Sequence, residues 1–282
     1  MPKAPSRDGV QIEYETFGDP SNEAILLING LGSQMTRWPE AFCEKLTAKG
    51  YFAIRFDNRD VGLSTWFKPG DAYKLEDMAA DAIAVLDAMK ILRAHIAGVS
   101  MGGMIAQTVA AIYSHRVLSL TSIMSATGAA QSLQSTPEAA AVLNTPAPDP
   151  KADFEAFVQH GMRNARTIGS PDYPWTDEQV RNRVVAEYNR AYNPLGVARQ
   201  MAAIRAAGDR TEAVKTIKCP TVVLHGKEDP LVPLAGGELT AAAIPGAELR
   251  VIPGMGHDLP PQLYDTVADA ILSAAARAKT TV

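Results

Sequence analysis

Cysteine, long apolar runs and blocks of like charge are all scarce or missing in this sequence. Only two of the 282 residues are cysteines, Cys43 and Cys219, and they lie far apart and outside any metal-ligand spacing. Neither a disulfide framework nor a zinc site is therefore expected. No stretch is apolar enough to span a bilayer or to act as a secretory signal core. We expect a cytoplasmic protein with buried free thiols and no membrane contact.

The charged residues give no sign of a polyanionic partner. The 27 lysines and arginines and the 31 aspartates and glutamates sum to a net charge of −4, and the two signs are interspersed. Proteins that follow a phosphate backbone usually carry a basic block, so nucleic acid is not an expected partner. The chain is 46% hydrophobic and long enough for one main domain with an insertion.

Short apolar runs recur along the chain and predict a buried sheet. Helical patterns at 75–90 and 104–113 lie between some of these runs, and this alternation is typical of a mainly parallel α/β sheet. Residues 9–18 alternate between apolar and polar and suit an antiparallel edge strand. Runs that are apolar throughout suit strands covered on both faces, and they occur at 24–28, 52–56, 95–99, 120–124, 221–225 and 249–252.

The strand signal stops at about Ala126 and returns only after Gly208, which predicts a helical insertion between two strands. We divide the chain into a first core part (1–125), a helical cap (126–208) and a second core part (209–282). In the last cap helix, Pro194 suits the first helical position and Gly208 the end. The apolar residues of this helix predict its inner face: Val197, Met201 and Ile204.

One serine lies between two glycines where a predicted strand meets a predicted helix. The stretch "GVSMG" (98–102) matches G-x-S-x-G in the strand–turn–helix context that this motif requires. A serine on such a sharp turn is lifted above the strand end, and the glycines let neighbouring backbone pass. By itself the pattern also fits an ordinary tight turn, so Ser100 is a candidate nucleophile only if it has partners.

A serine hydroxyl needs a base to take its proton and an acid to orient that base. Asp229 and His257 each follow a predicted strand, and the order Ser, Asp, His is the one that accompanies this motif. The carboxyl ends of parallel strands meet at one edge of a sheet, so the three side chains are expected to lie together. We prefer Asp229 to Glu228 because a short carboxylate is held more rigidly.

Other polar residues near these motifs are expected to be structural. Asp258 follows the predicted base and is expected to face solvent. The loop containing Asp57, Arg59 and Asp60 is expected to brace neighbouring turns. The other histidines are expected to be structural as well, with one of them, His160, left open as a pocket residue: His95, His115, His160 and His225.

Acyl transfer also needs donors for the negative oxygen that develops on the carbonyl. The backbone N–H of Met101, directly after the serine, is one candidate. The other comes from the loop after the first buried strand, "NGLGSQMTRW" (29–38), whose glycines allow the backbone to turn inward. We assign it to the N–H of Leu31, while an ordinary glycine turn remains the alternative.

These motifs resemble those of the α/β-hydrolase superfamily over almost the whole chain. The branch with aclacinomycin methylesterase and many esterases is the most similar. The resemblance implies an eight-stranded sheet with a helical cap, Ser100 as nucleophile, Asp229 as acid and His257 as base, with Leu31 and Met101 as the oxyanion hole. Two departures are Asn29 in place of the usual histidine and Asp60 in place of a glycine. The matching stretches are "NGLGSQMTRWP", "RFDNRDVGLST", "IAGVSMGGMIAQ", "LHGKEDPLVP" and "VIPGMGHDLP".

A serine rather than an aspartate at the elbow sets aside dehalogenase and epoxide hydrolase chemistry, and favours attack on a carbonyl. We therefore predict hydrolysis of small to medium neutral esters through an acyl-enzyme, without cofactor or metal, by a monomer or homodimer. Enol-lactone or C–C hydrolysis, perhydrolysis, acyl transfer and non-catalytic ligand binding remain alternatives. The candidate pocket residues are Trp175, Tyr188, Tyr192 and Met201, for which a place in the core of the cap is the alternative.

Overall fold

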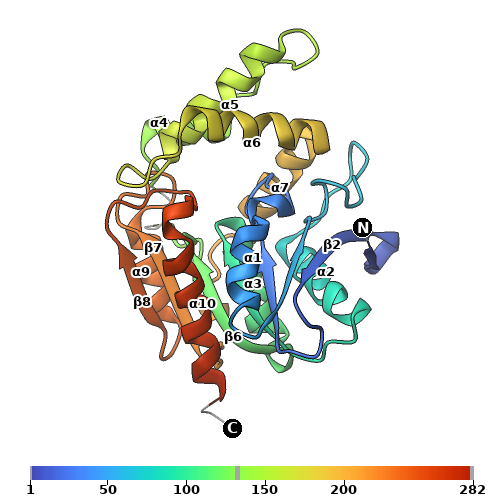
Figure 1. Cartoon of the computed structure of the whole chain (residues 1–282), viewed down its shortest axis with the longest axis vertical. Coiled ribbons are helices and arrows are strands. Elements are labelled where there is room, and N and C mark those ends of the chain that lie inside the picture. The colour runs from blue at the N-terminus through green and yellow to red at the C-terminus, as the bar shows by residue number, and fades with distance from the viewer. Residues whose placement is uncertain (1, 131–133, 280–282) are drawn as a thin grey trace.

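A computed structural model describes residues 2–130 and 134–279, and its strands form one twisted sheet (Figure 1). In the described residues the order is β1-β2-β4-β3-β5-β6-β7-β8. The pairings of β2 with β1 and with β4 are antiparallel, and all the others are parallel. The strands are β1 (Lys3–Pro5), β2 (Gln11–Phe17), β3 (Ala24–Ile28), β4 (Phe52–Phe56), β5 (Ala94–Val99), β6 (Val117–Ile123), β7 (Thr221–Gly226) and β8 (Glu248–Ile252).

Helices cover both faces of this sheet, which explains why its strands are apolar throughout. In β3, Ile25 and Leu27 pack with helices on one face, while Leu26 and Ile28 pack with helices on the other. Side chains of a strand alternate between faces, so a strand buried on both sides has no polar period. The first face carries α1 (Glu40–Thr47) and α10 (Tyr264–Lys279), and the second carries α2 (Leu75–Ala88), α3 (Met101–Ile112), α8 (Thr211–Val214) and α9 (Leu234–Ala243).

A group of helices lies beyond one end of the strands, and these helices come from the part of the chain where the sequence predicts a cap (Figure 1). They separate β6 from β7, and residues 131–133 of the predicted cap lie outside the described residues. None of the helices in the described ranges combines the length and apolarity needed to cross a bilayer. The cap helices are α4 (Pro137–Asn144), α5 (Phe154–Ile168), α6 (Asp177–Arg190) and α7 (Pro194–Ala207).

The first antiparallel strand is not at the edge, contrary to the prediction for residues 9–18. Its partner β1 pairs with it through Ala4 and Ile12 and is itself the edge strand. With only three residues, β1 is too short to produce a periodic pattern. The antiparallel direction of β2 is as predicted, and the fold class is confirmed as an eight-stranded, mostly parallel sheet with flanking helices.

Helix α7 begins at Pro194 and is followed by Gly208, as predicted, but its most buried residues lie beside the predicted inner face. Its buried residues are Gly196, Gln200 and Ala203, while Val197 is 38% exposed. The prediction selected the most apolar face of the helix, Val197, Met201 and Ile204. That choice was correct only in part: Ile204 packs against the core and Val197 against Gly32, but the most buried positions hold two small residues and Gln200, whose contacts are polar.

Candidate active site

Ser100 lies on a strained turn between β5 and α3. Its φ of 55° is in the left-handed region, which costs energy for a residue with a Cβ and persists only where the surroundings hold it. Its N–H donates to the carbonyl of Ile123 at 2.9 Å. A Cβ on Gly98 would lie 2.1 Å from the carbonyl oxygen of Gly102. Gly98, two residues before the serine, is thus required for the strand and helix to approach each other here.

The structure brings together the three side chains expected to act with one another. His257 Nε2 lies 2.9 Å from Ser100 Oγ, and His257 Nδ1 lies 2.7 Å from Asp229 Oδ2. A carboxylate can only accept a hydrogen bond, so Nδ1 carries the proton and donates it. Nε2 is then left to accept the hydroxyl proton of Ser100, which is the arrangement that a general base requires.

The carboxylate beside His257 comes from Asp229 and not from Glu228. Asp229 is 5% exposed, and its Oδ1 accepts the N–H groups of Leu231 and Val232, both at 2.9 Å. Glu228 is exposed and accepts the N–H of Gly254 instead. Two backbone donors therefore fix the Asp229 side chain and leave its second oxygen directed at the imidazole.

A second histidine comes near the same carboxylate without replacing His257. His225 Nε2 lies 3.7 Å from Asp229 Oδ2, but it makes its hydrogen bond, at 2.7 Å, to the carbonyl of Val232. Burial lowers the pKa of His225, a shift that the Val232 contact only partly offsets, so the ring is held neutral. Its contacts are those of a structural residue.

Two backbone N–H groups lie free around Ser100. Residue 30 of the loop after β3 approaches the serine so closely that a Cβ on Gly30 would lie 3.2 Å from the Cβ of Ser100. Within residues 2–130 and 134–279, the N–H groups of Leu31 and Met101 have no hydrogen-bond acceptor. Unpaired donors beside a nucleophile are what a developing oxyanion requires.

The loop that carries Leu31 is held from two sides. From the core, Asn58 Nδ2 donates to the carbonyl of Asn29 at 3.0 Å. From the cap, Gln200 Oε1 accepts the N–H of Gly32 at 2.8 Å. The sequence prediction did not include Gln200, although a glutamine on the same helix face as the small residues Gly196 and Ala203 was the signal that could have drawn attention to it.

Asp258 does not face solvent, contrary to the prediction. Its Oδ1 accepts the N–H and the hydroxyl of Ser170, which precedes α6 in the cap, at 3.0 and 2.5 Å. Burial raises the pKa of Asp258, and the hydrogen bonds from Ser170 oppose this shift. The N–H of His257 also donates to the carbonyl of Ile168 at 2.6 Å. The loop that carries the base is therefore bound directly to the cap.

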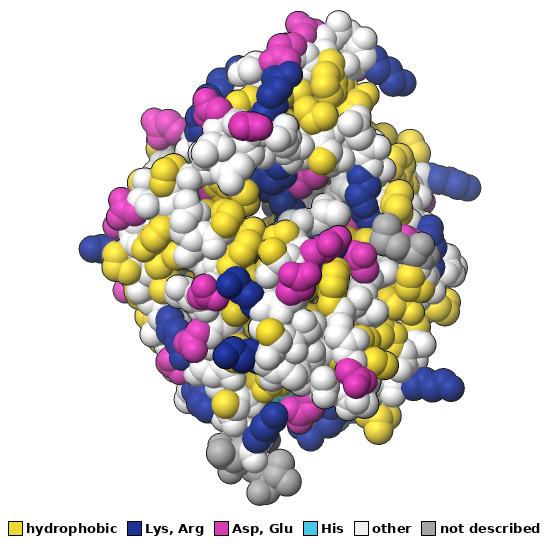
Figure 2. All heavy atoms as spheres, viewed as in Figure 1, with side chains coloured by type: hydrophobic (Ala, Val, Ile, Leu, Met, Phe, Trp, Pro, Cys, Tyr) yellow, Lys and Arg dark blue, Asp and Glu magenta, His cyan; other side chains and the backbone are white. Residues whose placement is uncertain are grey.

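The Asp57–Asp60 loop braces its neighbours, as expected, and also anchors the cap. Arg59 pairs with Asp81 in α2, with its Nε 2.6 Å from Oδ2. Asp60 pairs with Arg199 of α7 at 2.7 Å, and Asp57 lies 2.8 Å from Arg190 of α6. Charged side chains are visible in the hollow between cap and core (Figure 2). Polar contacts thus form much of this seam.

Three of the four candidate pocket residues lie in the cap's own apolar cluster. The rings of Tyr188, Tyr192 and Phe157 contact one another in tilted or edge-on arrangements, with centroids 5.2 to 5.5 Å apart, and Trp175 packs against the same cluster. Met201 is partly buried on α7, next to Gln200. These contacts are those of core residues of the cap, and a role in substrate contact stays a prediction.

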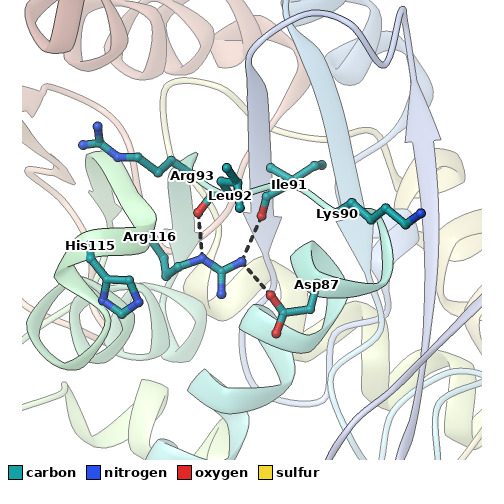
Figure 3. Close-up of a pocket in the computed structure, with 7 residues that line it drawn as sticks. All are labelled: Asp87, Lys90, Ile91, Leu92, Arg93, His115 and Arg116. Carbon is teal, nitrogen blue, oxygen red and sulfur yellow. Dashed lines mark hydrogen bonds and ion pairs between the residues drawn. The ribbon is translucent and has the colours of Figure 1, made fainter.

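A surface hollow of about 450 Å³ lies away from this site (Figure 3). Arg116 spans it, donating to the carbonyls of Leu92 and Ile91 and to Asp87. The residues around the hollow precede β5 and β6, whereas Ser100 follows β5. The hollow therefore lies at the opposite end of the strands from Ser100. Through its Nε and Nη2 atoms, Arg116 joins the turn before β5 to the turn before β6. Among the described residues, no group of three or more His, Cys, Asp or Glu side chains could hold a metal ion.

Known proteins are similar to this chain in sequence and in fold. Rhodomycin D methylesterase DauP from Streptomyces sp. strain C5 is 29% identical over 288 residues, covering 94% of this chain and 95% of the relative. 3-Oxoadipate enol-lactonase 2 from Acinetobacter baylyi is 24% identical and covers 93% of each chain. The meta-cleavage product hydrolase CumD from Pseudomonas fluorescens IP01 superposes with a TM-score of 0.81 at 23% identity, covering 99% of this chain and 98% of the other.

The methylesterase relatives support the prediction of an esterase-type hydrolase, and they confirm the resemblance to the methylesterase branch. The likeness to CumD, at its low identity, supports the fold alone. A family described as having the alpha/beta hydrolase fold matches residues 23–261, which include Ser100, Asp229 and His257. The chain belongs to the alpha/beta hydrolase fold family.

Proposed function

We propose that this protein hydrolyses carboxylic esters through an acyl-enzyme formed on Ser100. The observation that carries the proposal is the continuous line of contacts from Asp229 through His257 to Ser100, at 2.7 and 2.9 Å. Two unpaired backbone N–H groups beside the serine complete the set of groups that acyl transfer needs. Esters are the proposed substrate class because the relative DauP is a methylesterase.

In the first half of the reaction, Ser100 Oγ attacks the ester carbonyl while His257 Nε2 takes its proton. The carbonyl oxygen becomes negative and accepts hydrogen bonds from the N–H groups of Leu31 and Met101. When the tetrahedral intermediate collapses, the bond to the alkoxy group breaks and His257 returns the proton to the departing alcohol. Asp229 holds the Nδ1–H of His257 throughout and stabilises the positive imidazolium.

In the second half, water replaces the alcohol. His257 takes a proton from the water as it attacks the acyl carbon, and the same two N–H groups stabilise the second oxyanion. The bond to Ser100 Oγ then breaks, the proton passes back to the serine, and the carboxylic acid leaves. The same groups suit an enol-lactone, whose ring ester opens in one such cycle, and a lactonase is among the relatives.

The finer parts of the proposal concern the substrate and the setting. We also propose a preference for small to medium neutral esters, a monomeric or dimeric state and a cytoplasmic location. Cys43 and Cys219 are both free in the structure, which fits a reducing compartment. Burial raises the pKa of the Cys43 thiol to about 12, so that this residue is chemically inert at neutral pH.

Labelling of Ser100 tests the proposal directly. The protein is expected to turn over p-nitrophenyl acetate and butyrate, and to be modified by a fluorophosphonate at Ser100 alone, as located by peptide mass spectrometry. Ser100→Ala should remain folded and lose both reactions. Ser125, a buried serine whose hydroxyl donates to the carbonyl of Ser100, provides the control: Ser125→Ala should still be labelled. Absence of turnover together with absence of labelling in the wild-type protein would refute the proposal.

A further inference from the structure

One glutamine of the cap reaches into the loop that carries the proposed oxyanion donor. Gln200 is 0% exposed. Its Oε1 accepts the N–H of Gly32 at 2.8 Å, and its Nε2 donates to the carbonyl of Arg59 at 2.9 Å. The reverse orientation of the amide would place donor against donor and acceptor against acceptor, so both contacts together define how the side chain lies.

The segment that Gln200 holds is a tight turn. The N–H of Ser33 donates to the carbonyl of Gly30 at 3.2 Å and closes the turn over residues 30–33. Gly32 has a φ of +63°, in the region that favours glycine. In such turns the central peptide has alternative orientations. The hydrogen bond to Gln200 stabilises the orientation in which the Leu31–Gly32 peptide points its N–H at the cap.

This restraint acts one residue away from the reacting atoms. Leu31 is followed by Gly32, whose N–H is bound to Gln200, and preceded by Gly30, whose carbonyl accepts the N–H of Ser33. Its own N–H has no acceptor within the described residues. Val197, one turn earlier on α7, also covers the loop, since a Cβ on Gly32 would lie 2.9 Å from its Cγ2. Helix α7 thus contacts the turn both through an apolar side chain and through a buried hydrogen bond.

We propose that Gln200 is a positioning residue for the oxyanion hole, so that the cap is a part of the catalytic machinery as well as a cover for the substrate. The inference rests on the function proposed above and adds to it a residue from outside the core. Asn58 anchors the start of the same loop from the core side, through Asn29. Gln200 holds the same loop from the cap side, through the N–H of Gly32, and also binds the backbone carbonyl of Arg59.

The test separates transition-state stabilisation from substrate binding. Gln200→Met keeps the length and approximate volume of the side chain and removes both hydrogen bonds. We expect kcat for p-nitrophenyl butyrate to fall on the order of tenfold to a hundredfold, because small misplacements of catalytic groups cost this much. KM should change by less than about threefold, because the oxyanion contact is made only in the transition state. Inhibition by an alkyl trifluoromethyl ketone, which forms a tetrahedral adduct with serine, should weaken by the same factor as kcat.

A matched control lies beside Gln200 on the same helix. Arg199→Met removes the ion pair between cap and core at Asp60, and should lower the melting temperature without weakening the ketone relative to the substrate. Gln200→Asn keeps an amide but is one methylene too short to reach Gly32 and Arg59 together. It is expected to weaken the ketone in the same direction, and it carries the test if the methionine variant does not fold.

Two results would overturn the inference, and they differ. If wild-type protein is labelled at Ser100 and a folded Gln200 variant binds the ketone as tightly as wild type, Gln200 has no positioning role while the proposed function stands. If wild-type protein neither hydrolyses the ester nor reacts with a fluorophosphonate, the proposed function fails and this inference fails with it.

Discussion

Replacing Asp229 by asparagine tests the proposed base with no change in side-chain size. Oδ1 of Asp229 accepts two backbone N–H groups, from Leu231 and Val232, whereas Oδ2 accepts, among the described residues, only the Nδ1–H of His257. An asparagine at this position keeps its oxygen on the two backbone donors, because its NH2 group cannot accept them. The NH2 group is therefore directed at His257.

That orientation determines which nitrogen of the imidazole carries the proton. An NH2 group at 2.7 Å from Nδ1 needs a lone pair there, so the neutral ring must hold its proton on Nε2. The Nε2–H then points at Ser100 Oγ and can no longer take the hydroxyl proton. A wrong tautomer of this kind lowers kcat about 10⁴-fold in a Ser-His-Asp enzyme, which corresponds to about 5 kcal/mol of transition-state stabilisation.

Initial rates with p-nitrophenyl butyrate, measured beside thermal unfolding, provide the assay. Asp229→Asn should unfold near the wild-type temperature, since it keeps both backbone hydrogen bonds. Glu228→Gln is the matched control: this exposed carboxylate accepts the N–H of Gly254, and the variant should keep activity within a fewfold of wild type. A folded Asp229→Asn protein with activity within tenfold of wild type would refute the tautomer argument, as would a severe loss in Glu228→Gln.

Two further predictions concern stability. Burial lowers the pKa of His95 from 6.5 to about 4, so the unfolded chain binds a proton that the folded protein does not. The free energy of unfolding should therefore fall as pH drops from about 6.5 toward 4, by up to about 3 kcal/mol, and urea titrations of His95→Gln should show a smaller fall. Gly98→Ala places a Cβ 2.1 Å from the Gly102 carbonyl oxygen and should cost more than about 4 kcal/mol, whereas Gly70→Ala, which meets nothing within 4 Å, should cost only about 1–2 kcal/mol of backbone strain.

The sheet and the proposed catalytic residues could be predicted because local patterns carry them. A strand buried on both faces must be apolar at every position, as Ile25 to Ile28 are, and this marks it in the sequence. Parallel connections then bring the strand ends to one edge, so that Ser100, Asp229 and His257 can be grouped from chain order alone. The three-residue strand β1 is too short for such a pattern, and the prediction for residues 9–18 therefore placed the edge one strand too far into the sheet.

The seam between cap and core could not be predicted, because each of its contacts pairs residues that are distant in sequence. Nothing near Gln200 indicates that its partners are Gly32 and Arg59, and nothing near Asp258 indicates Ser170. The most buried positions of α7 are Gly196, Gln200 and Ala203, so hydrophobic periodicity placed the inner face of this helix beside the one that is most buried. The groups that carry out acyl transfer follow from the strand ends, whereas the groups that hold the oxyanion loop and the His257 loop in place lie in this polar seam. Substitutions in the cap should therefore change turnover as well as substrate preference.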